Sequence, residues 1–281
     1  MGLYYLSITY PLKGYLANLS IGLESIIIFI YLTMAALLMV RFIRNKKSHR
    51  DFRNLSWSFI FLGFGCAYFI YLYTDFITED TNLRNQFSII SYLFIGFGWL
   101  VSIIINEYVE KIPKRPFSFF SIIIVVILVI TVITKNKEMG YIALTIGLPL
   151  GILFLSYYSY RLYNLADRSQ EVKRQIILFF FSVLILILGY FCISDLLMSI
   201  FGLGIRIVGD LLVILGLHFF KWVVDKLPDF SEFEWTRSLQ SVVIVHSNGI
   251  PLFSRFWVSE DIDMELSKMD QDTMISAAIS S

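Results

Sequence analysis

Charged residues are scarce in this 281-residue chain, and cysteine and histidine are scarcer still. Lysine, arginine, aspartate and glutamate together make up 16% of the residues, against 57% hydrophobic and 17% aromatic residues. Because charged residues form about a quarter of an average soluble domain, this composition excludes an ordinary soluble protein. The net charge of +1 is uninformative. The basic loops reflect membrane topology and contact with anionic lipid before they suggest nucleic acid, so no nucleic-acid partner is expected.

The few cysteines and histidines limit the possible metal and cofactor chemistry. Both cysteines, Cys66 and Cys192, fall within long apolar segments, where a packed thiol is expected instead of a disulfide. His218 is the only histidine in such a segment, so paired haem ligands are absent. The last apolar segment has its only lysine, Lys221, at one end, which argues against a retinal protein. We expect no cofactor, no metal and, since no hydrolase, zinc-protease or P-loop motif occurs, no enzymatic activity.

Seven apolar stretches are long enough to cross a bilayer. About 20 helical residues span a hydrocarbon core of roughly 30 Å. A β-barrel would show short segments of alternating polarity, whereas residues 122–133 are apolar at every position except Thr131. The sequence therefore predicts an all-α polytopic membrane bundle with spans at 19–43, 55–77, 87–106, 117–134, 141–160, 175–200 and 204–222.

The basic residues between these spans predict the orientation. Thirteen lie in the connections after spans 1, 3 and 5, and five lie on the opposite side: Lys13, Arg84, Lys135, Lys137 and Arg206. By the positive-inside rule, the N-terminus is outside and the C-terminus is cytoplasmic. Residues 1–18 lack the basic region and the cleavage site of a signal peptide, so the first span is expected to remain part of the protein. The prediction is a multi-pass protein of the cell membrane.

Apart from Arg41 and Lys221 at the predicted cytoplasmic ends of the first and last spans, five charged residues fall within the predicted spans. Each costs about 2.5 to 3.5 kcal/mol at a helix centre, so such residues are rarely left unpaired. With the N-terminus outside, all five lie in the outer third of the bilayer: Glu24, Asp75, Asp195, Arg206 and Asp210. Their shared depth marks them as the candidate ligand-binding residues.

Two interpretations of these five residues remain open. Arg206 and Asp210 are four residues apart on one helical face and can pair, with Asp195 within reach. In the first interpretation, an ion-pair network only orders the outer ends of the helices. In the second, four carboxylates against one guanidinium form an outward-facing pocket suited to a cation, an amine or a proton.

The composition changes after residue 222. The sequence predicts a transmembrane domain at residues 1–222 and a charged linker at residues 223–236. Residues 237–281 are predicted to form a small cytoplasmic α/β element. In that element, 239–246 and 250–257 read as two strands joined by an Asn248-Gly249 turn, and a helix pattern follows Asp263. A hairpin alone is marginal in water, so it should pack on a partner.

The segment L-Q-S-V-V-I-V-H-S-N-G-I-P-L-F-S-R-F-W at 239–257, followed by M-I-S-A-A-I-S at 274–280, resembles the opening of a roadblock- or longin-like domain, as found after membrane segments in some archaeal proteins. The resemblance implies docking to a small GTPase or to another roadblock/longin-like protein. Such a domain continues through further strands and a helix that this chain lacks, so another subunit would complete the sheet or the chain is truncated. The seven spans resemble, in layout, the sensor regions that precede histidine kinases.

The predicted function is a receptor-like sensor that couples an external or lipid signal to the cytoplasmic module. A secondary transporter of a cation, a proton or a small amine is the alternative, and a structural membrane scaffold is the third reading. The expected partners are the lipid bilayer, a cytoplasmic protein and a second copy of the chain. Polar residues near the membrane midplane are few, which favours the sensor over the transporter.

Overall fold

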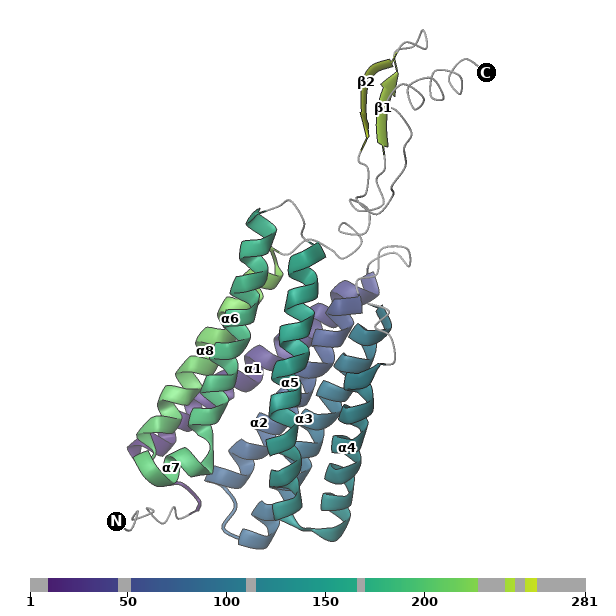
Figure 1. Ribbon diagram of the computed structural model, residues 1–281. Helices are drawn as coiled ribbons and strands as arrows, with labels where there is room; N and C mark the ends of the chain where they lie inside the picture. The colour runs from purple at the N-terminus through teal and green to yellow at the C-terminus, as the bar shows by residue number, and fades with distance from the viewer. Residues whose placement is uncertain are drawn as a thin grey trace, which may run out of the picture. The chain divides into compact units, whose positions relative to one another are not determined.

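The computed structural model describes residues 10–44, 52–109, 115–165, 170–226, 241–245 and 251–256. The chain divides into two compact units, Met1–Leu227 and Pro228–Ser281. Helices form the first unit (Figure 1): α1 (Tyr15–Arg44), α2 (Phe52–Phe76), α3 (Thr81–Val109), α4 (Pro116–Thr134), α5 (Lys137–Leu165), α6 (Gln170–Ile193), α7 (Asp195–Phe201) and α8 (Gly204–Val224).

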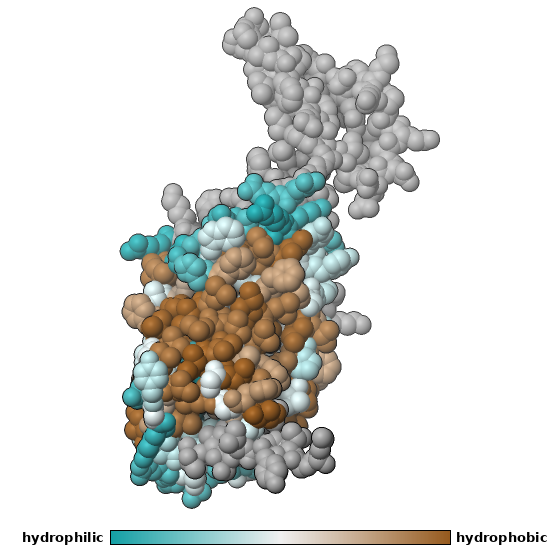
Figure 2. Space-filling model, turned by 90° about the vertical axis from the view of Figure 1, so that its left-hand side faces the viewer, coloured by the Kyte–Doolittle hydropathy of each residue, from teal (hydrophilic) through white to brown (hydrophobic). Residues whose placement is uncertain are grey.

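Seven of these helices are long and apolar enough to cross a membrane: α1 to α6 and α8. This confirms the seven predicted spans. Large apolar side chains such as Phe29 and Ile133 are exposed on the outside of the bundle, as a lipid-facing surface requires. On the face drawn in Figure 2, hydrophobic residues form a band between hydrophilic residues at the two ends of the bundle. The protein is therefore a multi-pass membrane protein that contacts lipid.

The helices pack in an order that brings the first and last spans together. α1 lies between α2 and α8, α8 packs on α6, and α3 packs on α2 and α4, while α5 contacts α3, α4 and α6. Aromatic side chains of three helices fill the space between them. The Phe220 ring lies 4.9 Å from Trp57, 5.1 Å from Phe61 and 5.4 Å from Phe179, measured between ring centroids. These contacts fix α2 against α6 and α8.

Glycines allow two helix pairs to approach until their backbones touch. A Cβ atom on Gly63 of α2 would lie 2.6 Å from the carbonyl oxygen of Phe94 on α3, and 3.3 Å from the Cα of Gly98. A Cβ atom on Gly209 of α8 would lie 2.8 Å from the carbonyl oxygen of Gly189 on α6. Small residues at such crossings increase van der Waals packing between the helices. This packing matters in a membrane, because the hydrophobic effect does not drive helices together in lipid.

The sixth predicted span, 175–200, extends beyond the end of the helix that the structure shows. α6 ends at Ile193, Ser194 adopts an extended conformation, and the seven-residue α7 starts at Asp195. The Ser194 hydroxyl accepts a hydrogen bond from the backbone N–H of Leu197, the contact of an N-cap residue. Because this cap starts a new helix, Asp195 lies at a helix end and is not embedded in a span.

The prediction of a small carboxy-terminal α/β element is wrong as a fold class. The described residues of the second unit form only two short strands, β1 (Ser241–Val245) and β2 (Pro251–Phe256), which pair antiparallel with Ile244 opposite Phe253. Two short strands do not by themselves make an α/β domain, because a two-stranded hairpin is only marginally stable. The predicted Asn248-Gly249 turn and the helix after Asp263 lie outside the described residues. The described fold is the all-helical bundle.

Candidate functional site

Arg206, near the start of α8, is the centre of a buried charged network. Its guanidinium contacts carboxylates from two other helices. Nε donates to Oε1 of Glu24 on α1 at 2.7 Å, Nη2 lies 2.6 Å from the same oxygen, and Nη1 lies 2.8 Å from Oδ2 of Asp75 on α2. The side chain of Arg206 is only 1% exposed. A planar guanidinium suits this geometry because it presents several donors in fixed directions.

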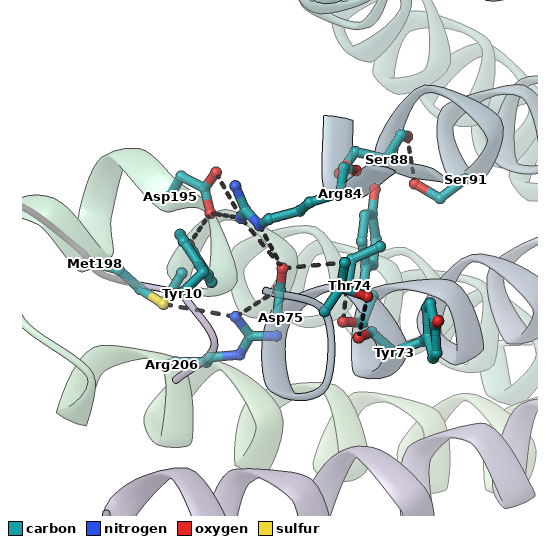
Figure 3. A network of polar contacts seen from close by, with 12 residues as sticks. Tyr10, Tyr73, Thr74, Asp75, Arg84, Ser88, Ser91, Asp195, Met198 and Arg206 are labelled. Carbon is teal, nitrogen blue, oxygen red and sulfur yellow. Dashed lines mark hydrogen bonds and ion pairs between the residues drawn. The ribbon is translucent and has the colours of Figure 1, made fainter. Parts of the chain in front are cut away.

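A second guanidinium extends the network to α3 and α7 (Figure 3). Nη2 of Arg84 lies 3.2 Å from Oδ1 of Asp75 and 3.4 Å from Oδ2 of Asp195. Asp75 therefore lies between two guanidiniums, and each of its oxygens contacts one of them. Asp195 is partly exposed, with 42% of its side-chain surface accessible. The network thus joins α1, α2, α3, α7 and α8 at one end of the bundle, which we call the network end.

Tyr10 lies over the network from the segment that precedes α1. Its hydroxyl donates to Oδ1 of Asp195 at 2.8 Å, and its ring centroid lies 3.4 Å from Cζ of Arg84. The backbone N–H of Leu12 also donates to the carbonyl of Asp75 at 2.8 Å. Burial, and then the negative charge of Asp195, raise the pKa of Tyr10 far above its ordinary value. The phenol therefore stays protonated and remains a donor to the carboxylate.

Asp210, one helical turn after Arg206, has a different partner from the predicted one. Its Oδ2 accepts a hydrogen bond from the hydroxyl of Ser20 at 2.8 Å, and the same hydroxyl lies 3.5 Å from Oε1 of Glu24. Among the described residues, Arg206 makes its polar contacts instead with Glu24, Asp75 and, at 3.7 Å, the sulfur of Met198. Asp210 is fully buried, so Ser20 holds it beside Glu24 without a guanidinium contact in the described part of the chain.

A further buried carboxylate, Glu107, has a structural role. It lies at the end of α3, where its oxygens accept hydrogen bonds from the backbone N–H groups of Phe117 and Ser118, at 3.0 and 2.9 Å, and from the Ser118 hydroxyl. The N-cap residue of α4, Arg115, makes no side-chain cap hydrogen bond. Glu107 therefore caps α4 and stabilises the positive end of its dipole.

The structure brings all five sequence-predicted site residues into one region, but it changes their pairing. The four carboxylates have two guanidiniums near them instead of the predicted one. The second guanidinium is that of Arg84, which lies in α3 and not in the predicted external connection. Sequence reasoning missed Arg84, Tyr10 and Ser20. The position of Arg84, nine residues after Asp75 across a tight turn, is a signal that could have found it. Tyr10 and Ser20 carry no such signal, because their partners are distant in sequence.

The chemistry available at the network is charge pairing and proton or cation exchange. Among the described residues, no group of three or more histidines, cysteines, aspartates and glutamates could hold a metal ion. The acids and guanidiniums of the network can instead exchange partners when a proton, a cation or a charged ligand enters.

Comparisons with protein families, with curated proteins and with solved structures find no match to this chain. No family is assigned. The resemblance to roadblock- and longin-like domains, and to an archaeal type, therefore has no family match in its support. The functional argument depends on the geometry of the network.

Proposed function

We propose that this chain is a receptor-like membrane sensor whose signal-receiving site is the charged network of Glu24, Asp75, Asp195, Arg206 and Asp210 with Arg84. The observation that carries this proposal is the position of Arg206: a buried guanidinium on α8 is held by carboxylates from α1 and α2. The Arg206 guanidinium can pair with more than one carboxylate, so it has discrete alternative arrangements. A charged signal that binds one of these carboxylates would change how the guanidinium pairs with the remaining ones.

In this proposal α8 is the helix that carries the response from the network to the other end of the bundle. α8 begins at the network and ends at Val224, from where the chain continues into the second unit. At this opposite end α1 and α8 meet in another ion pair, with Nη2 of Arg41 2.8 Å from Oδ1 of Asp225. Between the two ion pairs, residues of α1 and α8 line an apolar groove of about 540 Å³, with Phe29, Met34 and Leu215 among them. A change in the partners of Arg206 would therefore alter how α1 and α8 pack.

The proposal also includes an orientation in the membrane. The excess of Lys and Arg in the connections opposite the network end supports a network that faces the outside of the cell and an α8 that ends in the cytoplasm. In this arrangement a cytoplasmic protein partner receives the response through the segment after α8. The proposed protein has no enzymatic activity of its own, since the network offers partner exchange and no bond-breaking group.

Two alternatives have specific observations in their favour. Secondary transport of a proton or cation is supported by the two buried acids Glu24 and Asp210, which share one hydroxyl donor. A scaffold is supported by the many contacts of Arg206, because a paired buried ion network also orders helix ends. The sensor differs from both in requiring movement at the far end of α8.

Distance measurements test this requirement. Spin labels at Ile43 and Trp222, which are exposed near the ends of α1 and α8, would be introduced into a variant without Cys66 and Cys192 and measured in lipid nanodiscs. Asp75→Asn, which removes the charge between the two guanidiniums, should shift or broaden the distance distribution between the labels. Asp80→Asn is the matched control, because Asp80 is an exposed acid that lies outside the network.

An unchanged distribution in a folded Asp75→Asn protein would contradict the sensor and support the scaffold. Proton or sodium flux into proteoliposomes, lost in the same variant, would support the transporter. An Asp75→Asn protein that fails to fold can be replaced by Asp195→Asn, because Asp195 is partly exposed and its loss leaves Arg84 paired with Asp75.

A further inference from the structure

The buried charges of the network do not balance. Glu24, Asp75 and Asp210 are almost completely excluded from solvent, and the guanidiniums of Arg206 and Arg84 face them. Asp195 is accessible enough for water to solvate its charge. Three buried carboxylates against two guanidiniums leave one negative charge in excess. An uncompensated buried charge is costly, so a group of this kind becomes neutral instead.

The excess charge falls on the Glu24 and Asp210 pair. Among the described residues, Arg206 contacts Glu24 through Oε1 alone, and the one hydrogen-bond donor to Asp210 is the Ser20 hydroxyl. This hydroxyl carries a single hydrogen and can serve one carboxylate at a time. Oε2 of Glu24 and Oδ1 of Asp210 have no hydrogen-bond partner among the described residues, and neither has the hydroxyl of Tyr68 on α2. All three side chains are at most 1% exposed.

Tyr68 belongs to the same site. Its phenol is close enough to Asp210 and Glu24 to interact with both electrostatically. The ring of Tyr68 also lies 5.3 Å from that of Tyr190 on α6. Three buried oxygens without a hydrogen-bond partner among the described residues, two of them acidic, thus come from α1, α2 and α8 at this site.

We propose that Glu24 and Asp210 hold one proton between them, so that this acid pair is a proton-binding site inside the network. The proton neutralises the excess charge and supplies the donor that one of the unpartnered oxygens lacks. Two carboxylates that share a site do not both ionise, because each disfavours the charge of the other. This inference deepens the proposed function by naming the proton as the signal that the network takes.

The groups that face the pair determine when the proton leaves. Asp75 on α2 and Arg206 on α8 are charged, and the hydroxyls of Ser20 on α1 and Tyr68 on α2 are neutral. From α6, Cys192 lies beside the α8 backbone at Gly209, and Tyr190 packs on Tyr68. Arg206 is the one cation within the described ranges that directly contacts the pair, through Glu24. Movement of this guanidinium away from Glu24 would therefore favour proton uptake, and its return would favour release.

Infrared spectroscopy of the full chain in lipid bilayers tests the proposal. A protonated carboxyl group shows a carbonyl stretch that an ionised one lacks, and this band shifts on exchange into deuterium oxide. The wild type should show one such band near neutral pH that disappears as the pH is raised. Asp210→Asn and Glu24→Gln should each remove or displace this band. Asp195→Asn should leave it unchanged, because Asp195 is partly exposed and paired with Arg84.

Several outcomes would overturn the proposal. A wild type without the band, or a band that survives both Asp210→Asn and Glu24→Gln, excludes a shared proton at this pair. A wild type without the band whose thermal stability rises with added NaCl would assign the site to a sodium ion. These results are separate from the distance measurement: a proton band without helix movement contradicts only the sensor, and helix movement without the band contradicts only the proton.

Discussion

Glu24 and Arg206 are 182 residues apart in the chain, and their buried side chains are in direct contact. Two guanidinium nitrogens of Arg206 lie 2.7 and 2.6 Å from one carboxylate oxygen of Glu24. This contact joins the first span to the last one, and the second oxygen of Glu24 has no hydrogen-bond partner among the described residues. The sensor function that we propose depends on this contact.

Removal of the central guanidinium should destabilise the bundle. Arg206→Gln leaves Glu24 buried without its guanidinium partner and leaves Asp75 with Arg84 alone, which costs about 3–5 kcal/mol. Thermal unfolding of purified protein in detergent should show a large loss of stability, whereas Arg41→Gln should cost under about 1 kcal/mol, because the Arg41 pair with Asp225 is partly exposed. Equal effects of the two changes would contradict the burial argument.

The contact between α2 and α3 depends on the absence of a side chain at Gly63. Gly63→Ala places a Cβ atom 2.6 Å from a backbone oxygen, so the helices must separate, at a cost of about 1–3 kcal/mol. Gly22→Ala on α1 is the matched control, since a Cβ atom there meets nothing within 4 Å. Yield of folded protein and its unfolding temperature compare the two, and a tolerated Gly63→Ala would show that the pair can relax.

The Tyr10 contact predicts a loss of stability at high pH. The folded protein holds the phenol proton at pH values above about 10, where an unfolded tyrosine releases it, because the pKa of Tyr10 is raised. The unfolded state therefore binds fewer protons, and stability falls as the pH rises through this range. Tyr10→Phe should flatten this part of the stability profile and lower stability near pH 7 by about 0.5–1.5 kcal/mol for the lost hydrogen bond. A Tyr10→Phe profile parallel to that of the wild type would argue against the contact.

The orientation can be measured with single cysteines in the variant without Cys66 and Cys192. A cysteine at Glu79, an exposed position between α2 and α3, should react with a membrane-impermeant maleimide added to intact cells. A cysteine at Lys226 should react only after the membrane is permeabilised, because the basic residues predict a cytoplasmic end for α8. The reverse pattern would place the network in the cytoplasm and remove the external signal from the proposed function.

Several parts of the candidate site could be predicted because burial in lipid is costly for every charge. Glu24 and Asp75 stand out as ionisable residues within apolar runs, and a single orientation gives them the same depth as Arg206. Depth, however, does not identify partners. The four-residue spacing of Arg206 and Asp210 predicted a pair, whereas α8 directs Arg206 to α1 and α2 and leaves Asp210 to Ser20.

The sequence by itself determined the seven spans, because hydrophobic length is a local property that bilayer thickness selects. It also predicted the depth of the charges. Only the tertiary structure decided that α1 packs beside α8, that Arg84 is the second guanidinium, and that Glu24 and Asp210 share one hydroxyl. The physical reason is that these contacts depend on helix rotation and neighbour order. Close packing at glycines such as Gly63 and Gly209 sets both, and no single segment encodes them.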